Sequence, residues 1–264
     1  MAESLLANRV AIVTGASRGI GEYIARHLAR AGATVVVAAR SEEVSDPRLP
    51  GTIHSVAESI NAQGGRAVAI PVNMRDPESI NECVTRTVAE LGRLDIVVNN
   101  AAILVPGDIE TVQDRHIDLM WQVDLRGPIL MCKAAVPHLK QAGGGHLINI
   151  SSSAALFPGP GPYENPSIGG LFYGTVKAGL ERFTQGLAQE LQDDHISANV
   201  LSLGYLIRTP GNVWAQNDPA NPNLDFDDAE WMGKAAVWIA SQPPKYTGQI
   251  VFDDQIRYWL DAID

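Results

Sequence analysis

The chain has few cysteines and few charged residues for its length. Only Cys83 and Cys132 occur in 264 residues, and they are too few and too far apart to predict a disulfide framework or a zinc site. We therefore expect two buried thiols that act as small apolar side chains in a reducing compartment. Charged residues make up 19% of the chain, against roughly 25% in typical domains. This composition excludes a disordered chain and supplies enough apolar residues for a large core.

Long apolar runs and a surplus of basic charge are also lacking. No run approaches the roughly 18–20 residues of a transmembrane span, and the segment Met1–Arg9 contains an acid, Glu3, and no apolar signal-peptide core. The formal net charge is −10, and an acidic surface repels phosphate backbones and anionic membranes. We expect a cytoplasmic protein whose partners are neither nucleic acids nor membranes.

Short apolar runs alternate with longer amphipathic stretches along the whole chain. The runs are Val10–Val13, Thr34–Ala39, Ala67–Val72, Ile96–Val98, Leu147–Ile150, Ala198–Leu201 and Gln249–Phe252. Several are continuous runs of valine, isoleucine and alanine, which is typical of parallel strands covered on both faces. Between them, Ile20, Ile24 and Leu28 repeat every four positions, and Asp76–Pro77 suits the start of another helix. The alternation predicts an α/β fold. We expect one domain over residues 1–264, a Rossmann-type doubly wound parallel sheet of about seven strands with helices on both faces.

Two segments rich in glycine and proline follow predicted strands, namely Phe157–Gly170 and Leu203–Asp228. In open α/β sheets, ligands bind beyond the carboxyl ends of the strands. We therefore predict substrate loops at about 153–170 and 203–228, with plain surface connections as the alternative. A third irregular segment, Ser45–Gly51, follows the second predicted strand and should lie near the same edge.

A glycine-rich turn joins the first predicted strand to the first predicted helix. It reads Thr14-Gly15-Ala16-Ser17-Arg18-Gly19-Ile20-Gly21. Glycines permit a tight turn and let backbone N–H groups approach a pyrophosphate, which the start of the helix also favours. The spacing alone is a weak signal, but its place between strand and helix favours a dinucleotide site over a simple structural turn.

The end of the second predicted strand bears on which dinucleotide binds. NAD sites usually place an acid there to bind the ribose 2′-hydroxyl, whereas this strand ends at Arg40 and Ser41. Arg40 and Arg18 could bind a 2′-phosphate, and Ser41 could add a hydroxyl. The sequence therefore favours NADP(H) over NAD(H), with two ordinary surface arginines as the alternative.

A tyrosine and a lysine four positions apart, Tyr173 and Lys177, fall on one face of a predicted helix. A phenol has a pKa of about 10 and is a poor base at neutral pH. A nearby ammonium favours the phenolate and lowers that pKa toward the working range. Upstream, the serines Ser151, Ser152 and Ser153 follow the fifth predicted strand, where a hydroxyl could orient and polarise a substrate carbonyl. The pattern predicts a proton-transfer site.

Together these motifs resemble the classical short-chain dehydrogenase/reductase family. The glycine-rich turn, the segment Asn99-Asn100-Ala101, the sequence Asn-Ile-Ser-Ser and the Y-x-x-x-K pattern occur in the family's order. The resemblance extends from Arg9 to about Phe252. Within the family, Pro47–Ile53 resembles the hydroxysteroid dehydrogenase-like branch.

The resemblance implies an oxidoreductase that interconverts a ketone and a secondary alcohol by direct hydride transfer, without a metal. With the preference indicated by Arg18 and Arg40, we expect it to depend on NADP(H). The resemblance further implies that Tyr173 is the general acid/base and that Lys177 lowers its pKa and bonds the nicotinamide ribose. The catalytic serine is then Ser152, with Ser151 and Ser153 left open. The implied cofactor contacts are Gly15, Ser17, Arg18, Gly19, Ile20, Gly21, Arg40, Ser41, Asn73, Met74, Asn100, Ala101, Tyr173, Lys177 and Gly204.

The sequence departs from the family pattern at several positions. Asp124 stands where the family usually has an asparagine, so we include it in the catalytic set as a group that either supports the charged lysine or disrupts the proton relay. A family glycine is replaced by Ala102, and a proline by Leu203. Ser152 and Tyr173 are 21 residues apart, where the family has about a dozen, so we expect the extra segment to loop out.

The candidate substrate residues are mostly apolar. They are Leu104, Val105, Leu156, Phe157, Phe172, Tyr205, Leu206, Ile207 and Trp214. They favour an uncharged, fairly hydrophobic ketone or alcohol. The resemblance also implies a homodimer or homotetramer. The alternative function, motivated by Asp124 and Leu203, is a non-catalytic dinucleotide-binding sensor or scaffold.

Overall fold

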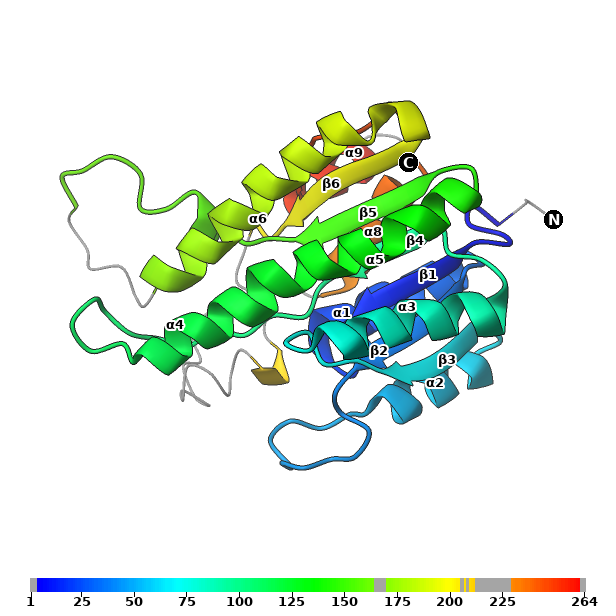
Figure 1. Ribbon diagram of the computed structural model, residues 1–264, viewed down its shortest axis with the longest axis horizontal. Coiled ribbons are helices and arrows are strands. Elements are labelled where there is room, and N and C mark those ends of the chain that lie inside the picture. Colours follow the sequence, from blue (N-terminus) through cyan, green and yellow to red (C-terminus); the bar gives the residue numbers. More distant parts are fainter. Residues whose placement is uncertain (1–3, 164–169, 205–206, 208, 212–228, 262–264) are drawn as a thin grey trace.

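The computed structural model describes residues 4–163, 170–204, 207, 209–211 and 229–261. They contain a seven-stranded sheet in the order β3-β2-β1-β4-β5-β6-β7, in which all neighbouring strands are parallel (Figure 1). The strands are β1 (Val10–Thr14), β2 (Thr34–Ala39), β3 (Arg66–Pro71), β4 (Ile96–Asn99), β5 (Gly145–Ile150), β6 (Ile196–Ser202) and β7 (Ile250–Phe252). Every predicted strand is confirmed, and the predicted Rossmann-type α/β fold with it.

The helices between the strands cover both faces of this sheet. They are α1 (Gly19–Arg30), α2 (Ile53–Ala62), α3 (Pro77–Leu91), α4 (Asp114–Met120), α5 (Gly127–Gln141), α6 (Leu171–Glu190), α8 (Glu230–Ala240) and α9 (Asp253–Asp261). Two short 3-10 turns are η2 (Ser153–Ala155) and η3 (Gln192–Asp194). A π-helical segment, η1 (Trp121–Arg126), joins α4 to α5 without a break in the chain. Insertions of this kind are frequent at functional sites.

The start of α3 shows how local sequence sets an element. Asp76 is the N-cap, and its side chain accepts a hydrogen bond from the backbone N–H of Glu78. Pro77 occupies the first helical position, where its missing N–H costs nothing. The helix ends before Gly92, which has a φ of +80°. The predicted helix start at Asp76–Pro77 is confirmed.

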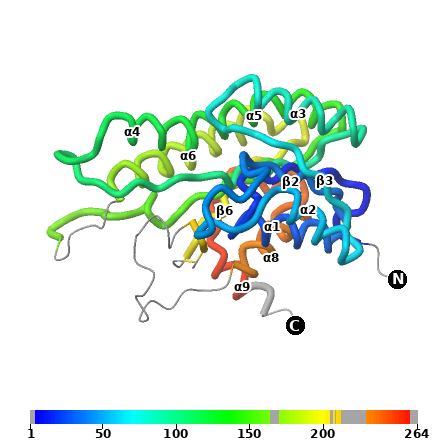
Figure 2. The backbone as a smooth tube through the Cα atoms, turned by 90° about the horizontal axis from the view of Figure 1, so that it is seen from below, coloured from blue at the N-terminus to red at the C-terminus, as the bar shows by residue number. Residues whose placement is uncertain are grey.

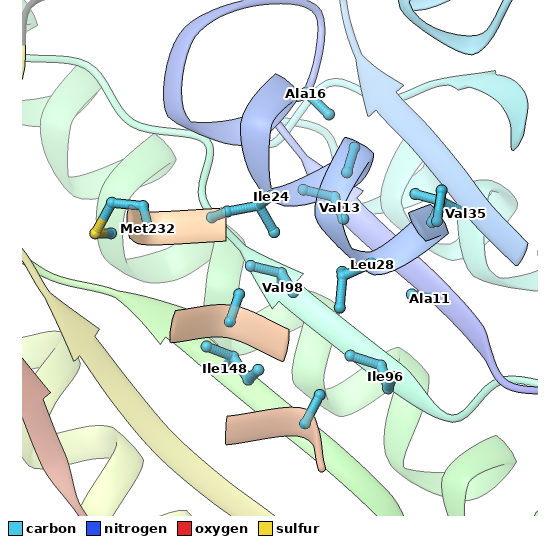
Figure 3. Packing of buried hydrophobic residues seen from close by; sticks show 14 of the residues in the cluster. Ala11, Val13, Ala16, Ile24, Leu28, Val35, Ile96, Val98, Ile148 and Met232 are labelled. Carbon is cyan, nitrogen blue, oxygen red and sulfur yellow. The ribbon is translucent and has the colours of Figure 1, made fainter. Parts of the chain in front are cut away.

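The core lies in two layers because successive residues of a strand point to opposite faces of the sheet. On one face, Ala11 and Val13 of β1 pack with Ile24 and Leu28 of α1 and with residues of α2 and α8 (Figure 3). On the other face, Ile12 packs with residues of α3, α5 and α6. Figure 2 shows these two groups of helices on opposite sides of the strands.

The scarce cysteines behave as predicted. Cys83 and Cys132 are free and buried, and burial raises the pKa of each thiol to about 12. Across the described residues, no helix combines the length and the apolar character needed to cross a membrane.

The parallel arrangement brings the carboxyl ends of β1, β4 and β5 to one edge of the sheet. The predicted substrate loops leave this edge but fall partly on residues 164–169, 205–206, 208 and 212–228, which lie outside the described residues. The described part of this edge consists of the strand ends and the helices that follow them.

Candidate active site

The glycine-rich turn packs directly against the chain that follows β4. Gly15 and Gly19 have φ values of +68° and +60°, in the left-handed region that favours glycine. A Cβ atom on Gly21 would lie 2.5 Å from Nδ2 of Asn100. That same Nδ2 donates a 2.9 Å hydrogen bond to the carbonyl oxygen of Thr14. Two of the family motifs are thus parts of one structure, in which a side chain at Gly15 or Gly21 does not fit.

A cavity of about 390 Å³ lies over this turn. The described residues that line it include Gly15, Ser17, Arg18, Gly19, Ile20, Gly21, Arg40, Ser41, Asn73, Met74, Asn100 and Ala101. Each of these is a predicted cofactor contact. They bring together the first turn and the ends of β2, β3 and β4, which the sequence places far apart.

Three of the predicted cofactor contacts, Gly204, Tyr173 and Lys177, do not line this cavity. Gly204 is not among the described residues that line the cavity, and its N–H donates a 2.7 Å hydrogen bond to Oδ1 of Asp253. The group expected to face the nicotinamide therefore already has a partner at the start of α9. Tyr173 and Lys177 likewise do not line this cavity, and they lie at the neighbouring strand end.

Sequence reasoning also missed several lining residues, namely Ala39, Val72, Arg75, Ala102, Ile103, Leu119, Val123, Thr209 and Gly211. Leu119 and Val123 are four residues apart on the α4–η1 helix, so helical spacing could have identified them. Arg75 follows directly on the predicted contacts Asn73 and Met74, and its position after β3 was the available signal.

Arg18 and Arg40 meet at the cavity but have different surroundings. Arg18 donates hydrogen bonds to the carbonyl oxygens of Pro50 and Gly51 and to Oγ of Ser41, at 3.0, 3.0 and 3.1 Å. Burial lowers the pKa of Arg18, and the charge of Arg40 lowers it further. The Arg18 bonds hold the segment Ser45–Gly51 beside the cavity, as predicted. The exposed Arg40 side chain has no hydrogen bond or ion pair within the described part of the chain.

Tyr173 and Lys177 lie on one face of α6, where Lys177 is buried and Tyr173 is half-buried. Nζ of Lys177 lies 5.5 Å from the centroid of the Tyr173 ring and donates a 2.9 Å hydrogen bond to the carbonyl oxygen of Ile150. Burial lowers the pKa of Lys177, whereas the charges of Asp124 and Glu181 raise it.

The expectation that the Tyr173 pKa is lowered is wrong for this structure. Burial raises it, the charge of Asp124 raises it further, and the interaction with the Ser152 side chain lowers it only in part. Desolvation disfavours the phenolate because the charged form would be taken out of water. The Tyr173 side chain is therefore a neutral phenol, a proton donor, at neutral pH.

Asp124 is fully buried within the π-helical segment η1. Its Oδ1 accepts a 2.8 Å hydrogen bond from the N–H of Ile103, while its Oδ2 has no partner among the described residues. Burial raises the pKa of Asp124 to about 7, although the charge of Lys177 and the Ile103 bond act to lower it. Asp124 can therefore gain or lose a proton close to neutral pH.

The three serines after β5 have distinct surroundings. Ser151 is buried, and its Oγ donates a 2.6 Å hydrogen bond to Oε1 of Glu181. Ser152 caps η2 by accepting from the N–H of Ala154, and its side chain interacts with Tyr173. Of the three, Ser152 is therefore the one placed beside the tyrosine.

Tyr163, the nearest tyrosine before Tyr173 in the sequence, lies on an exposed loop and donates to the carbonyl oxygen of Gly159. The candidate substrate residues divide into several groups. Val105 and Phe172 pack beside Tyr173 in a small apolar cluster. Leu156 and Phe157 are exposed. Tyr205, Leu206 and Trp214 lie outside the described residues.

One of the candidate substrate residues, Ile207, is a core residue. Its side chain is 1% exposed and belongs to the main core cluster with α1 and α8. It therefore supports the fold and has no free face for a substrate.

Comparisons with known proteins agree with this geometry. The pattern of the family described as short chain dehydrogenase matches residues 9–218. Hydroxysteroid dehydrogenase-like protein 2 from Danio rerio is 36% identical over 252 residues, which cover 95% of this chain and 58% of that protein. This chain thus spans less than two thirds of the length of that relative.

Solved structures give the same result at the level of the fold. A short chain dehydrogenase from Mycobacterium thermoresistibile aligns with a TM-score of 0.83 and 30% identity over 97% of this chain and 88% of its own. A metagenomic short-chain oxidoreductase in complex with NADP aligns with a TM-score of 0.75 and 29% identity over 94% and 97%. With its sheet order, glycine-rich turn and Ser-Tyr-Lys arrangement, this chain belongs to the short-chain dehydrogenase family.

Proposed function

We propose that the protein is an NADP(H)-dependent carbonyl reductase that interconverts a ketone and a secondary alcohol. The observation that carries the choice of nucleotide is the charge of the cavity. Among its described lining residues the charged side chains are Arg18, Arg40 and Arg75, and none is an acid. This holds although the chain has a formal net charge of −10. A local group of guanidinium ions suits a ligand with several phosphates.

Arg40 is the residue we assign to the 2′-phosphate. Arg18 already donates to Pro50, Gly51 and Ser41, whereas the Arg40 guanidinium has no side-chain partner within the described residues. Burial lowers the pKa of Arg18, and the charge of Arg40 lowers it further. An anion bound between the two arginines would relieve this repulsion. The related metagenomic structure that contains NADP supports the same choice.

The fit of a dinucleotide is supported by the turn itself. Gly15 and Gly21 leave no room for a side chain against the segment after β4, so the backbone of the turn stays open toward the cavity. NADPH supplies a hydride equivalent when it is bound. The part played by this chain is to hold the cofactor, orient the carbonyl and provide a proton.

Tyr173 provides that proton. Its raised pKa keeps the phenol protonated at neutral pH, which suits protonation of the alkoxide that develops during reduction. The Ser152 hydroxyl, beside Tyr173, orients the carbonyl oxygen. Lys177 places a positive charge beside Tyr173, and its hydrogen bond to the Ile150 oxygen fixes the position of that charge. The pKa of Asp124, about 7, lets its carboxyl group carry a proton close to neutral pH. The raised pKa of Tyr173 disfavours the phenolate that alcohol oxidation requires, so we propose that oxidation needs a more alkaline pH than reduction.

We propose an uncharged, apolar ketone as the substrate class. Ile103, Leu119 and Val123 form an apolar wall of the cavity, and Val105 and Phe172 pack beside the tyrosine. Apolar walls with a few polar groups are typical of sites for such ligands. The name of the Danio rerio relative places steroid ketones among the compounds to test.

The test is a panel of aliphatic, aromatic and steroid ketones, followed by NADPH absorbance with NADH in parallel. We expect turnover of apolar ketones and a preference for NADPH. Tight nucleotide binding without turnover of any ketone would instead favour the non-catalytic sensor, for which the Asp124 charge beside Tyr173 is the motivating observation.

A further inference from the structure

Glu181 is a second buried acid near Lys177, and no step of the proposed reaction uses it. It lies one helical turn after Lys177 on α6, and only 7% of its surface is exposed. Its Oε1 accepts a 2.6 Å hydrogen bond from Oγ of Ser151, which is itself 1% exposed. Burying a carboxyl group costs free energy unless its partners compensate. Here burial raises the pKa of Glu181, while the Ser151 bond and the Lys177 charge lower it.

The hydrogen bond between Ser151 and Glu181 is part of a row of polar contacts between the end of β5 and one face of α6. Consecutive residues of the strand end and of the loop after it each meet a residue of the helix. The contacts are Asn149 Nδ2 to Thr184 Oγ1 at 2.8 Å, Lys177 Nζ to the Ile150 oxygen at 2.9 Å, Ser151 Oγ to Glu181 Oε1 at 2.6 Å, and the Ser152 side chain with Tyr173. Glu181 therefore fixes the residue immediately before the candidate catalytic serine.

Glu181 also bears on the charge of Lys177. Three titratable side chains influence this ammonium or lie beside it: Asp124 from η1, and Tyr173 and Glu181 from α6 itself. Burial drives the ammonium toward its neutral form, and the two carboxylates oppose this change. Removing one carboxylate should make Lys177 lose its proton at a lower pH.

We propose that Glu181 is a positioning residue for the reaction. Through Ser151 it fixes the end of β5 against α6, and its carboxylate keeps the Lys177 ammonium charged. The inference rests on the proposed function, because it assumes that a charged Lys177 is needed for nucleotide binding and turnover.

The experiment compares Glu181→Gln with the wild-type protein. The glutamine keeps the size and an oxygen acceptor for Ser151 but removes the charge. We expect the melting temperature to fall only modestly, because the Ser151 bond is kept while the buried Lys177 ammonium loses one compensating charge. We also expect the alkaline limbs of NADPH affinity and of kcat/KM to move to lower pH by about one unit. Glu190→Gln, at an exposed position of the same helix, is the control and should leave both profiles unchanged.

Two further variants keep the test decisive. Glu181→Asp restores the charge, so it should return the alkaline limbs toward their wild-type position. If Glu181→Gln does not fold, Ser151→Ala combined with Glu181→Met removes both partners of the bond, which is close to neutral for stability, and should show the same shift.

A lower melting temperature with unchanged alkaline limbs would overturn the proposal, because Glu181 would then have only a structural role. The proposed function fails in a different way: the wild-type protein would bind NADPH and reduce no ketone. NADPH affinity against pH is measured without turnover, so it would still decide whether Glu181 sets the charge of Lys177.

Discussion

Nζ of Lys177 donates a 2.9 Å hydrogen bond to the carbonyl oxygen of Ile150, the last residue of β5. The lysine is buried, so this bond replaces part of the hydration that the ammonium loses. It also fixes the charge at the junction of α6 and the sheet. The position of the candidate catalytic groups is therefore set by the strand end.

Replacement of Tyr173 by phenylalanine removes the proposed proton donor. We expect kcat for ketone reduction to fall by about 10²–10⁴-fold, with little change in NADPH affinity, measured by NADPH absorbance and by fluorescence titration. Tyr163→Phe is the matched control, because that hydroxyl bonds the Gly159 oxygen on an exposed loop. A Tyr173→Phe enzyme with near wild-type turnover would show that another group transfers the proton.

Arg40→Asp should weaken NADPH binding far more than NADH binding. A charge-assisted hydrogen bond contributes about 1.5–3 kcal/mol, which corresponds to roughly a 10- to 100-fold change in Kd for NADPH. Arg30→Asp, at an exposed position near the end of α1, makes the same change of charge away from the cavity and serves as the control. Equal losses for both nucleotides would contradict the assignment of Arg40 to the 2′-phosphate.

Asp124→Asn should change both stability and pH dependence. The pKa of Asp124 is raised from 3.8 to about 7 in the folded protein. Its stabilising contribution is therefore complete below the unfolded value and is lost as pH rises through the folded value. Asparagine does not titrate, so the variant should gain stability over the wild type between these two pH values, by about 4 kcal/mol at most.

The measurement is thermal denaturation of the wild type and of Asp124→Asn across this pH range. The difference between their melting temperatures should shrink as the pH falls. Loss of the carboxylate also removes a charge that raises the pKa of Tyr173, so alcohol oxidation should reach half its maximal rate at a lower pH. A stability difference that does not vary with pH would contradict the raised pKa of Asp124.

Gly21→Ala should abolish nucleotide binding and lower stability. Its Cβ would lie 2.5 Å from Nδ2 of Asn100 and 2.6 Å from the Gly15 oxygen, so the turn would have to move away from the segment after β4. Gly186→Ala, inside α6, would place its Cβ 3.5 Å from a flexible Arg182 side chain. This control should raise stability by roughly 0.5–1 kcal/mol. Normal NADPH binding by Gly21→Ala would rule out the close packing of the turn.

The strands and the cofactor side of the cavity could be predicted from local patterns. Continuous apolar runs indicate buried parallel strands, and residues at the carboxyl ends of such strands must meet at one edge. That rule is enough to bring Gly15, Arg40, Asn73 and Asn100 together. The apolar wall of Leu119 and Val123 was missed, although their spacing of four residues places both on one helix face.

The sequence by itself determined which candidate groups stand at the ends of strands and which share a helix face, because apolar runs and helical spacing are short-range properties of the chain. Only the tertiary structure decided how those groups titrate and which are free. It showed that burial raises the pKa of Tyr173, that Gly204 is bonded to Asp253, and that Glu181 reaches Ser151. These results depend on desolvation and on contacts between distant segments, and neither is present in a local sequence pattern.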